Sequence, residues 1–142
     1  MATAGYSGKP LPDKLGLKAG MAAAFVGLPD SLRDLAAVAE LSSSDRFANW
    51  RAVKAAMKYD FVHAFSRLRA EVENELARLQ GAIVRNGMIW VSWPKKASKV
   101  ATDLDENVVR AAALRLDLVD IKVAAIDATW SGLKLVIRKD RR

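Results

Sequence analysis

The sequence has 142 residues, and its 23 Lys and Arg side chains outnumber 16 Asp and Glu, which gives a formal charge of +7. It contains no cysteine and one histidine, His63, which excludes thiolate nucleophiles, zinc fingers, iron–sulfur clusters and multi-histidine metal sites. Hydrophobic residues make up 51%, enough to fold residues 1–142 as one domain. The charge favours polyanionic partners, although a charge that serves only solubility is the simpler interpretation.

Residues 1–20 are rich in glycine, proline and lysine and predict an extended N-terminal segment with at most one helical turn. The apolar run Met21–Gly27 lies between glycines and predicts a buried strand. Asp30 or Ser31 then caps a helix that is expected to reach about Leu41. The apolar face of this helix is predicted to consist of Leu32, Leu35, Val38 and Ala39. No segment has the length and apolarity of a signal peptide or membrane span, so we expect a cytoplasmic protein without a membrane partner.

The segment after this helix is the hardest to assign. Ser42–Asp45 favour a break, and residues 46–58 fit either a short strand followed by a turn or an irregular helix. Beyond it, four apolar runs predict strands at Tyr59–Phe65, Met88–Trp93, Lys122–Ile126 and Leu133–Ile137. Helical spacing predicts a helix over about 66–85, which Asn86-Gly87 would end.

A second helix is expected after the basic loop Pro94–Ala101. Two overlapping capping boxes at 102–106 predict its start, and it should reach Leu116. Its predicted buried face consists of Leu104, Val108, Ala111 and Ala112. The last two strands have only a hairpin-length loop, 127–132, between them, so one of them must run antiparallel to its neighbours.

Alternation of strands and helices with short connections requires a parallel sheet flanked by helices. The fold class predicted from the sequence is therefore α/β: a small Rossmann-like three-layer sandwich, with a mostly parallel sheet and a C-terminal antiparallel strand pair. Ligands of such sheets bind beyond the carboxyl ends of the strands, where the strand order reverses. This rule selects the loops Gly27–Ser31, Ser66–Arg69, Trp93–Lys99 and Trp130–Gly132.

The loop after the first strand is a weak candidate for an anion site. It has one glycine, Gly27, instead of a G-x-G-x-x-G run; Pro29 lacks an N–H, and Asp30 would repel a phosphate. A capped turn is the preferred interpretation. His63 and Asp60 lie three residues apart in a predicted strand and face opposite sides, which argues against a catalytic dyad and favours a buried or edge histidine.

The basic loop is the more suggestive candidate. Three lysines within five residues follow Trp93, an arrangement that would combine phosphate neutralisation with base stacking or cation–π contact. On the alternative interpretation Trp90 and Trp93 pack on opposite faces of the sheet and the lysines only solvate a loop. The candidate ligand or partner surface is Trp93, Lys95, Lys96, Ser98, Lys99, Asp127, Trp130 and Ser131. The sequence predicts no catalytic residue, no metal site and no cofactor.

Several runs of the sequence resemble an uncharacterised bacterial family of small proteins, a domain of unknown function. These runs are YSGKPL (6–11) with KLG (14–16), WPKKAS (93–98) and DATWSGL (127–133). A broader similarity is to a shortened class I methyltransferase-like fold. That resemblance implies S-adenosylmethionine (SAM) bound by a glycine-rich loop after the first strand and by an acidic residue after the second. Here the first loop has one glycine, and no acidic residue can be assigned to the end of a second strand.

Three hypotheses follow from these patterns. The main one is a non-catalytic binding or interaction module, with an anionic or protein partner on the basic loop and Trp130; a nucleic acid is one such partner. The first alternative is a degenerate SAM-dependent methyltransferase-like protein that binds SAM near Gly27. The second alternative is a homodimeric structural protein with no ligand.

Overall fold

The computed structural model describes residues 9–38 and 40–142 and contains a six-stranded sheet. Its strand order is β2-β1-β3-β4-β6-β5; the first four strands are parallel, and β6 runs antiparallel to both of its neighbours. The strands are β1 (Ala22–Val26), β2 (Ser43–Phe47), β3 (Tyr59–Phe65), β4 (Ile83–Pro94), β5 (Leu118–Ala125) and β6 (Trp130–Ile137). The predicted α/β fold class, mostly parallel with an antiparallel C-terminal pair, is confirmed.

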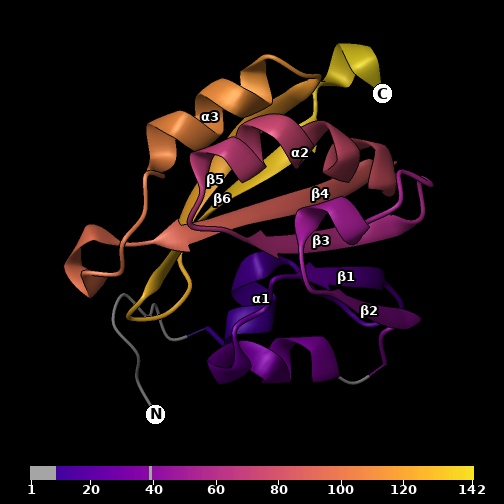
Figure 1. Cartoon of the computed structure of the whole chain (residues 1–142). Coiled ribbons are helices and arrows are strands. Elements are labelled where there is room, and N and C mark those ends of the chain that lie inside the picture. The colour runs from indigo at the N-terminus through magenta and orange to yellow at the C-terminus, as the bar shows by residue number, and fades with distance from the viewer. Residues whose placement is uncertain (1–8, 39) are drawn as a thin grey trace.

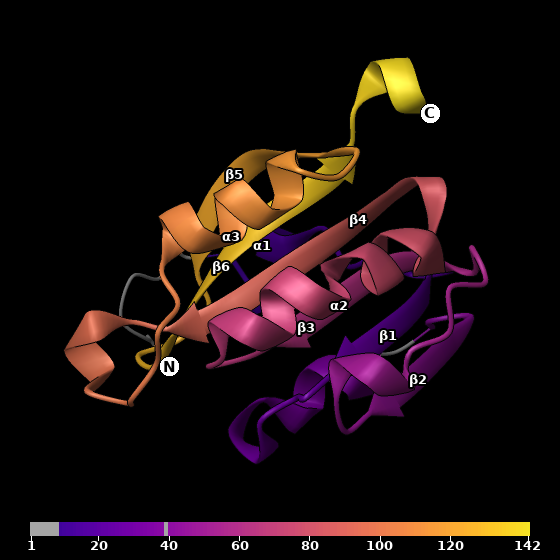
Figure 2. The same cartoon turned by 45° about the horizontal axis from the view of Figure 1, so that its top comes forward.

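Helices cover both faces of this sheet, as Figures 1 and 2 show. On one face lie α2 (Arg69–Ala82), α3 (Glu106–Leu114) and the 3₁₀ turn η2 (Trp50–Ala52). On the other lie α1 (Leu11–Leu15) and the 3₁₀ helix η1 (Asp30–Ala37). Two further 3₁₀ turns are η3 (Lys96–Ser98) and η4 (Lys139–Arg141). None of the helices among the described residues is long and apolar enough to traverse a bilayer.

The two faces bury separate cores, and the two tryptophans of β4 divide between them. Trp90 packs with Phe25, Phe61 and Leu15 beneath α1 and η1. Trp93 is buried on the side of α2 and α3. Residues three apart on a strand face opposite sides, and the prediction for this pair is confirmed.

The first predicted helix is shorter than expected. Its residues form the 3₁₀ helix η1, which ends at Ala37, and Val38 is already extended. The carbonyl oxygen of Ala36 accepts a hydrogen bond from the Ser44 hydroxyl at 2.6 Å, so a side chain from β2 satisfies it instead of another helical turn. Ala39, assigned to the apolar face of the helix, lies outside the described residues, as do residues 1–8 of the predicted N-terminal segment.

No helix continues through residues 42–45, as expected, but the structure adds a strand there, because Ser43–Phe47 form β2. Of the two alternatives for 46–58, the structure matches the short strand followed by a turn. The sequence does not predict this strand, because it has no apolar run. It lies at the sheet edge with one neighbour, β1, and its residues alternate between half-buried and exposed.

The longest predicted helix ends earlier than its apolar spacing indicates. Helix α2 stops at Ala82, and Ile83 opposite Tyr59 already belongs to β4. Asn86-Gly87 therefore lies within a strand, where the register of β3 and β4 shifts. A Cβ on Gly87 would lie 3.0 Å from the carbonyl oxygens of Tyr59 and Val84, so close backbone approach requires glycine there.

Helix α3 begins at a different cap from the two that were predicted. Asp105 alone caps it, accepting the Val108 N–H at 2.9 Å, while the Thr102 hydroxyl donates to the Arg67 carbonyl oxygen instead. The buried helix positions are Val109, Ala112 and Ala113. The predicted face is therefore correct in part. Ala112 is buried in the helix and Leu104 is buried ahead of it, whereas Val108 is half-buried and Ala111 is exposed.

Candidate functional site

A cavity lies where the strand order of the sheet reverses. The chain passes from β1 outward to β2 and then returns to β3 on the other side of β1, so the carboxyl ends of β1 and β3 flank the reversal. Ligands in open α/β sheets bind at this position. The cavity has a volume of about 410 Å³ and is lined by Gly27, Pro29, Phe65, Ser66, Arg67, Leu68, Glu71 and Trp130. A second cavity of about 400 Å³ is lined by Gly27, Leu28, Arg46, Phe47 and Ala48. The two cavities therefore share Gly27 as a lining residue.

Gly27 holds the ends of three strands together. Its φ of +64° is a left-handed conformation that favours glycine. Its N–H donates to the Phe47 carbonyl oxygen at 2.8 Å, and a Cβ would lie 3.0 Å from the Phe65 carbonyl oxygen. A side chain at this position would therefore adopt a strained conformation and press on the Phe65 carbonyl oxygen, which would disturb the contact between the ends of β1 and β3.

Glu71, in the first turn of α2, supplies a carboxylate to the cavity wall. Its Oε1 accepts a 2.6 Å hydrogen bond from the Ser66 hydroxyl, and its Oε2 lies 3.5 Å from the Trp50 backbone nitrogen. The Trp50 indole donates to the Phe65 carbonyl oxygen at 3.0 Å. The cavity thus combines one carboxylate with the Arg67 guanidinium and an indole, that of Trp130.

His63 lies behind this cavity and is fully buried. Its Nε2 is 2.8 Å from the Ser92 hydroxyl, and its ring stacks on Phe65 with centroids 4.2 Å apart. Burial lowers the pKa of His63 to about 3, so the ring is neutral at physiological pH. The Asp60 carboxylate accepts the backbone N–H of Ala22 at 2.9 Å and makes no hydrogen bond to His63 within the described chain. His63 is a buried histidine and forms no dyad with Asp60.

The structure brings the two predicted loops together. Trp93 pairs with Ser131 across β4 and β6, and the Lys95 N–H donates to the Thr129 carbonyl oxygen at 2.8 Å. Asp127 accepts the backbone N–H groups of Thr129 and Trp130, which shapes the β5–β6 turn. Figures 1 and 2 show this turn beside η3 at one end of the sheet.

The members of the predicted surface differ in accessibility. Trp93 is only 6% exposed and packs in the core. Lys96 and Lys99 are exposed, while Lys95 and Ser98 are half-buried and joined by a 2.6 Å hydrogen bond from the Ser98 hydroxyl to the Lys95 carbonyl oxygen. Of the eight residues, Trp130 is the one that also lines the cavity at the strand reversal, where its ring meets Phe65 edge-on at 5.2 Å.

Sequence reasoning selected the loop at Ser66 but missed Glu71. The signal was an acidic residue in the first turn of a helix, a common position that by itself indicates only favourable interaction with the helix dipole. The strand β2 ends at Phe47 and is followed by Ala48 and Asn49. The Asn49 side chain accepts the Ala52 N–H and caps η2, so no carboxylate stands at the end of β2.

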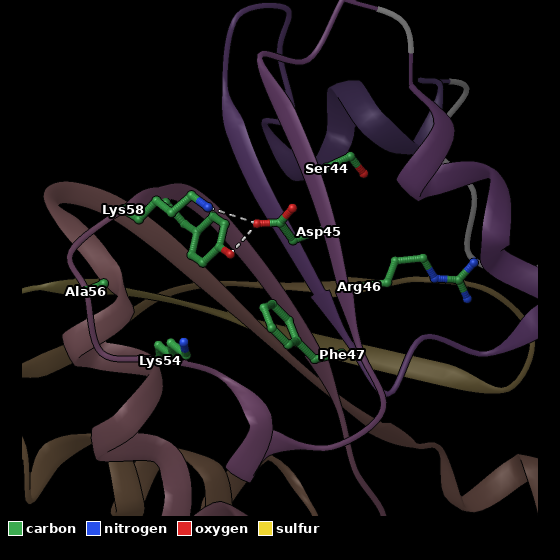
Figure 3. Close-up of a pocket in the computed structure, with 8 residues that line it drawn as sticks. Ser44, Asp45, Arg46, Phe47, Lys54, Ala56 and Lys58 are labelled. Atoms are coloured by element: carbon green, nitrogen blue, oxygen red, sulfur yellow. Dashed lines mark hydrogen bonds and ion pairs between the residues drawn. The ribbon is translucent and has the colours of Figure 1, made fainter.

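A third cavity, of about 590 Å³, lies along the open edge of β2 (Figure 3). One carboxylate oxygen of Asp45 accepts hydrogen bonds from the Lys58 ammonium, at 3.2 Å, and from the Tyr59 hydroxyl, at 2.5 Å. The hydrogen bond from Tyr59 is the largest cause of the lowered pKa of Asp45. The same contact and, more strongly, burial raise the pKa of Tyr59 to about 12.

Replacing Tyr59 with Phe is expected to raise the pKa of Asp45 toward its ordinary value, because the phenol that stabilises the carboxylate is removed. Carboxyl carbon shifts in an NMR titration measure this change. Lys58→Met is the comparison variant and should also raise the Asp45 pKa, because the ammonium stabilises the same carboxylate. An unchanged Asp45 titration in Tyr59→Phe would contradict the assignment.

Known proteins resemble this chain in structure alone. No protein-family model matches the sequence, and no curated protein matches it. A SAM-dependent methyltransferase from Aquifex aeolicus superposes with a TM-score of 0.62 at 14% identity, covering 90% of this chain and 88% of the other. Magnesium protoporphyrin IX methyltransferase from Synechocystis, solved with bound SAM, gives a TM-score of 0.59 at 12% identity, with 90% and 74% covered. A TehB-like SAM-dependent methyltransferase from Corynebacterium glutamicum gives 0.57 at 10% identity, with 90% and 85% covered.

These comparisons correct the main functional hypothesis. The non-catalytic binding module is contradicted, because the three structures named above are methyltransferases, and its methyltransferase-like alternative is favoured. At such low identity the likeness is one of fold. The chain has the Rossmann-like fold of the class I SAM-dependent methyltransferases.

Proposed function

We propose that this chain is a degenerate SAM-dependent methyltransferase-like protein that binds SAM in the cavity at the strand reversal. The observation that carries the proposal is the position of this cavity between the carboxyl ends of β1 and β3, with Gly27 at the junction of two adjoining hollows. This is the place where the fold class binds its ligands. The two volumes, about 410 and 400 Å³, fall in the range of small-molecule sites.

The lining residues suit the charges of SAM. Arg67 would pair with its carboxylate, Glu71 would face its cationic groups, and the Trp130 ring would add a cation–π contact. When bound, SAM supplies an electrophilic methyl group on a sulfonium. The departure from the fold family is the end of β2, where Phe47 and Ala48 offer no carboxylate to the ribose. We therefore describe the site as degenerate.

Thermal unfolding with and without SAM tests this proposal. At a SAM concentration of ~100 Kd the folded protein should gain about 2.7 kcal/mol. Gly27→Ala should abolish the gain, because its Cβ would press against the Phe65 carbonyl oxygen. Gly20→Ala is the matched control: Gly20 also has a positive φ, +85°, but a Cβ there has no heavy atom within 4 Å. Absence of a shift at millimolar SAM would contradict SAM binding.

We further propose that the candidate surface formed by the basic loop and the β5–β6 turn, with its exposed lysines, binds an anionic methyl acceptor or partner. Trp130 supports this proposal, because it belongs both to this surface and to the cavity wall. A triple variant with Gln at Lys95, Lys96 and Lys99 should bind single-stranded oligonucleotide more weakly and with a flatter salt dependence, while its SAM-induced stabilisation persists. Unchanged oligonucleotide affinity and slope would argue against this surface.

Membership of the uncharacterised bacterial family of small proteins also stays a proposal, together with a cytoplasmic location. In this chain the WPKKAS and DATWSGL runs pair through Trp93 and Ser131. A structure of a second protein that carries these motifs should show the same strand order, and a different order would exclude a shared family.

A further inference from the structure

A cluster of lysines lies on the sheet face beneath α1, away from the proposed SAM cavity. Lys134, in the middle of β6, stands directly opposite Trp90 of β4 on one side and Lys122 of β5 on the other. Directly opposed residues project to the same face of a sheet. Because Trp90 packs beneath α1, both lysines project to that face. Lys18 follows α1 and adds a third ammonium, close enough to perturb Lys134 electrostatically. We call Lys18, Lys122 and Lys134 the lysine cluster.

No carboxylate balances these charges. Within residues 9–38 and 40–142, no ion pair joins a member of the lysine cluster to an acidic side chain. Residues 1–8 and 39 contain neither Asp nor Glu. Partial burial, followed by the charges of Lys122 and Lys18, lowers the pKa of Lys134. Folding therefore brings like charges together and desolvates one of them, and both effects cost free energy.

Part of this arrangement has a structural role. The Lys122 ammonium donates to the Lys14 carbonyl oxygen at 3.2 Å, and the Lys14 ammonium donates to the Ala125 carbonyl oxygen at 3.0 Å. These bonds attach α1 to β5. A lysine ammonium has three donors, however, so this contact uses one N–H of Lys122 and leaves two for another acceptor.

The Lys134 ammonium lies close to the end of α1. A Cβ on Gly16 would lie 3.8 Å from its nitrogen and 3.5 Å from the Met88 sulfur, so Gly16 and Met88 border the ammonium. Three different segments supply the lysines: Lys18 follows α1, Lys122 lies in β5 and Lys134 lies in β6. Three positive charges in one neighbourhood suit a compact, multiply charged acceptor that accepts several hydrogen bonds at once.

We propose that the lysine cluster binds a phosphate group, held by Lys18, Lys122 and Lys134 beside Gly16. The phosphate would offset the repulsion that the folded protein otherwise carries. The site is independent of the proposed function, because it lies in the middle of β5 and β6 and shares no residue with the cavities at Gly27.

Pyrophosphate binding to the wild-type chain and to Lys134→Gln tests the proposal. Without the anion and at low salt, Lys134→Gln should melt at a higher temperature than the wild type, because repulsion and desolvation are relieved. Pyrophosphate should raise the wild-type melting temperature beyond sodium chloride of equal ionic strength, and its Kd should rise at least tenfold in Lys134→Gln. Lys139→Gln is the matched control, since it removes the same charge from an exposed position in η4 and should keep the wild-type response.

A second variant and a second probe complete the test. Lys122→Gln should also weaken pyrophosphate binding, although it loses the hydrogen bond to α1 and is expected to melt earlier. A short single-stranded oligonucleotide that binds more tightly than pyrophosphate, with a loss in Lys134→Gln, assigns the phosphate to a nucleic-acid backbone. If Lys134→Gln binds pyrophosphate more weakly and the oligonucleotide binds the wild type no more tightly than pyrophosphate does, the bound phosphate is a free or small-molecule phosphate. Equal affinities of wild type and Lys134→Gln for both probes would overturn the site.

Discussion

As the pH falls from well above 6.5 to well below 3, the folded protein is expected to lose about 5 kcal/mol of stability through His63 alone. The unfolded chain protonates His63 near its ordinary pKa of 6.5, whereas burial lowers the pKa in the folded state to about 3. The unfolded state therefore binds the proton first. The contribution of neutral His63 is complete above pH 6.5 and is lost as the pH falls toward 3. Each pH unit in this window is worth ~1.4 kcal/mol.

Urea unfolding at a series of pH values measures this loss, and the control is a double variant, His63→Phe with Ser92→Ala. Phe keeps an aromatic ring stacked on Phe65, and removing the Ser92 hydroxyl avoids leaving it without its partner. The variant should lose less stability than the wild type over this window, since only its carboxyl groups titrate there. Parallel stability curves, or a ring-proton NMR titration of His63 near pH 6.5 in the folded protein, would contradict the burial argument.

Truncating Trp50 to Ala is expected to destabilise the protein by about 3–5 kcal/mol, the range for removal of a buried tryptophan. Trp50 is the first residue of η2, and its side chain is fully buried in the core on the α2 side of the sheet. Its indole also donates to the Phe65 carbonyl oxygen, which would then be left without that partner. Chemical denaturation monitored by circular dichroism gives the free energy of unfolding.

Trp50→Phe separates packing from hydrogen bonding, and it serves if Trp50→Ala does not fold. Phe retains part of the buried volume but has no N–H for the Phe65 carbonyl oxygen, and the expected loss is about 1–3 kcal/mol. Because that oxygen lies against Gly27 at the cavity, Trp50→Phe should also weaken SAM binding, if SAM binds there. A stability within ~0.5 kcal/mol of the wild type would show that neither the packing nor the hydrogen bond matters.

Strands buried on both faces were the easiest elements to predict. Met21–Gly27 and Tyr59–Phe65 are apolar runs between turn residues, and they match β1 and β3 closely because their neighbours on both faces are apolar. The edge strand β2 has no such signature. Its residues Ser43–Phe47 are mostly polar, and pairing with β1 makes them a strand.

Helix ends were harder, for a related reason. The apolar spacing through Ile83 continues a helical pattern, yet Ile83 pairs with Tyr59 and begins β4. Period and composition describe a residue's own preference, whereas a helix terminus depends on which partner reaches its backbone groups first. The hydroxyl of Ser44 at the end of η1 is a second example.

The candidate site also has residues that the sequence predicts and residues that only tertiary contacts bring into place. The rule for strand ends selected Gly27 and Ser66 from the sequence, because both follow apolar runs. It did not select Glu71, whose place at the cavity depends on hydrogen bonds from Ser66 and Trp50. These contacts join residues from separate elements and have no local pattern.

The sequence by itself determined the α/β alternation, the antiparallel C-terminal pair and the opposite faces of Trp90 and Trp93, because each follows from periodicity or loop length within a short window. Only the tertiary structure decided that two strand ends border a cavity at Gly27, that His63 is buried and neutral, and that Lys122 and Lys134 stand opposite each other on one face of the sheet. The physical reason is that burial, electrostatic repulsion and cavity shape depend on distances between segments far apart in the chain. The fold sets those distances after the local preferences have been satisfied.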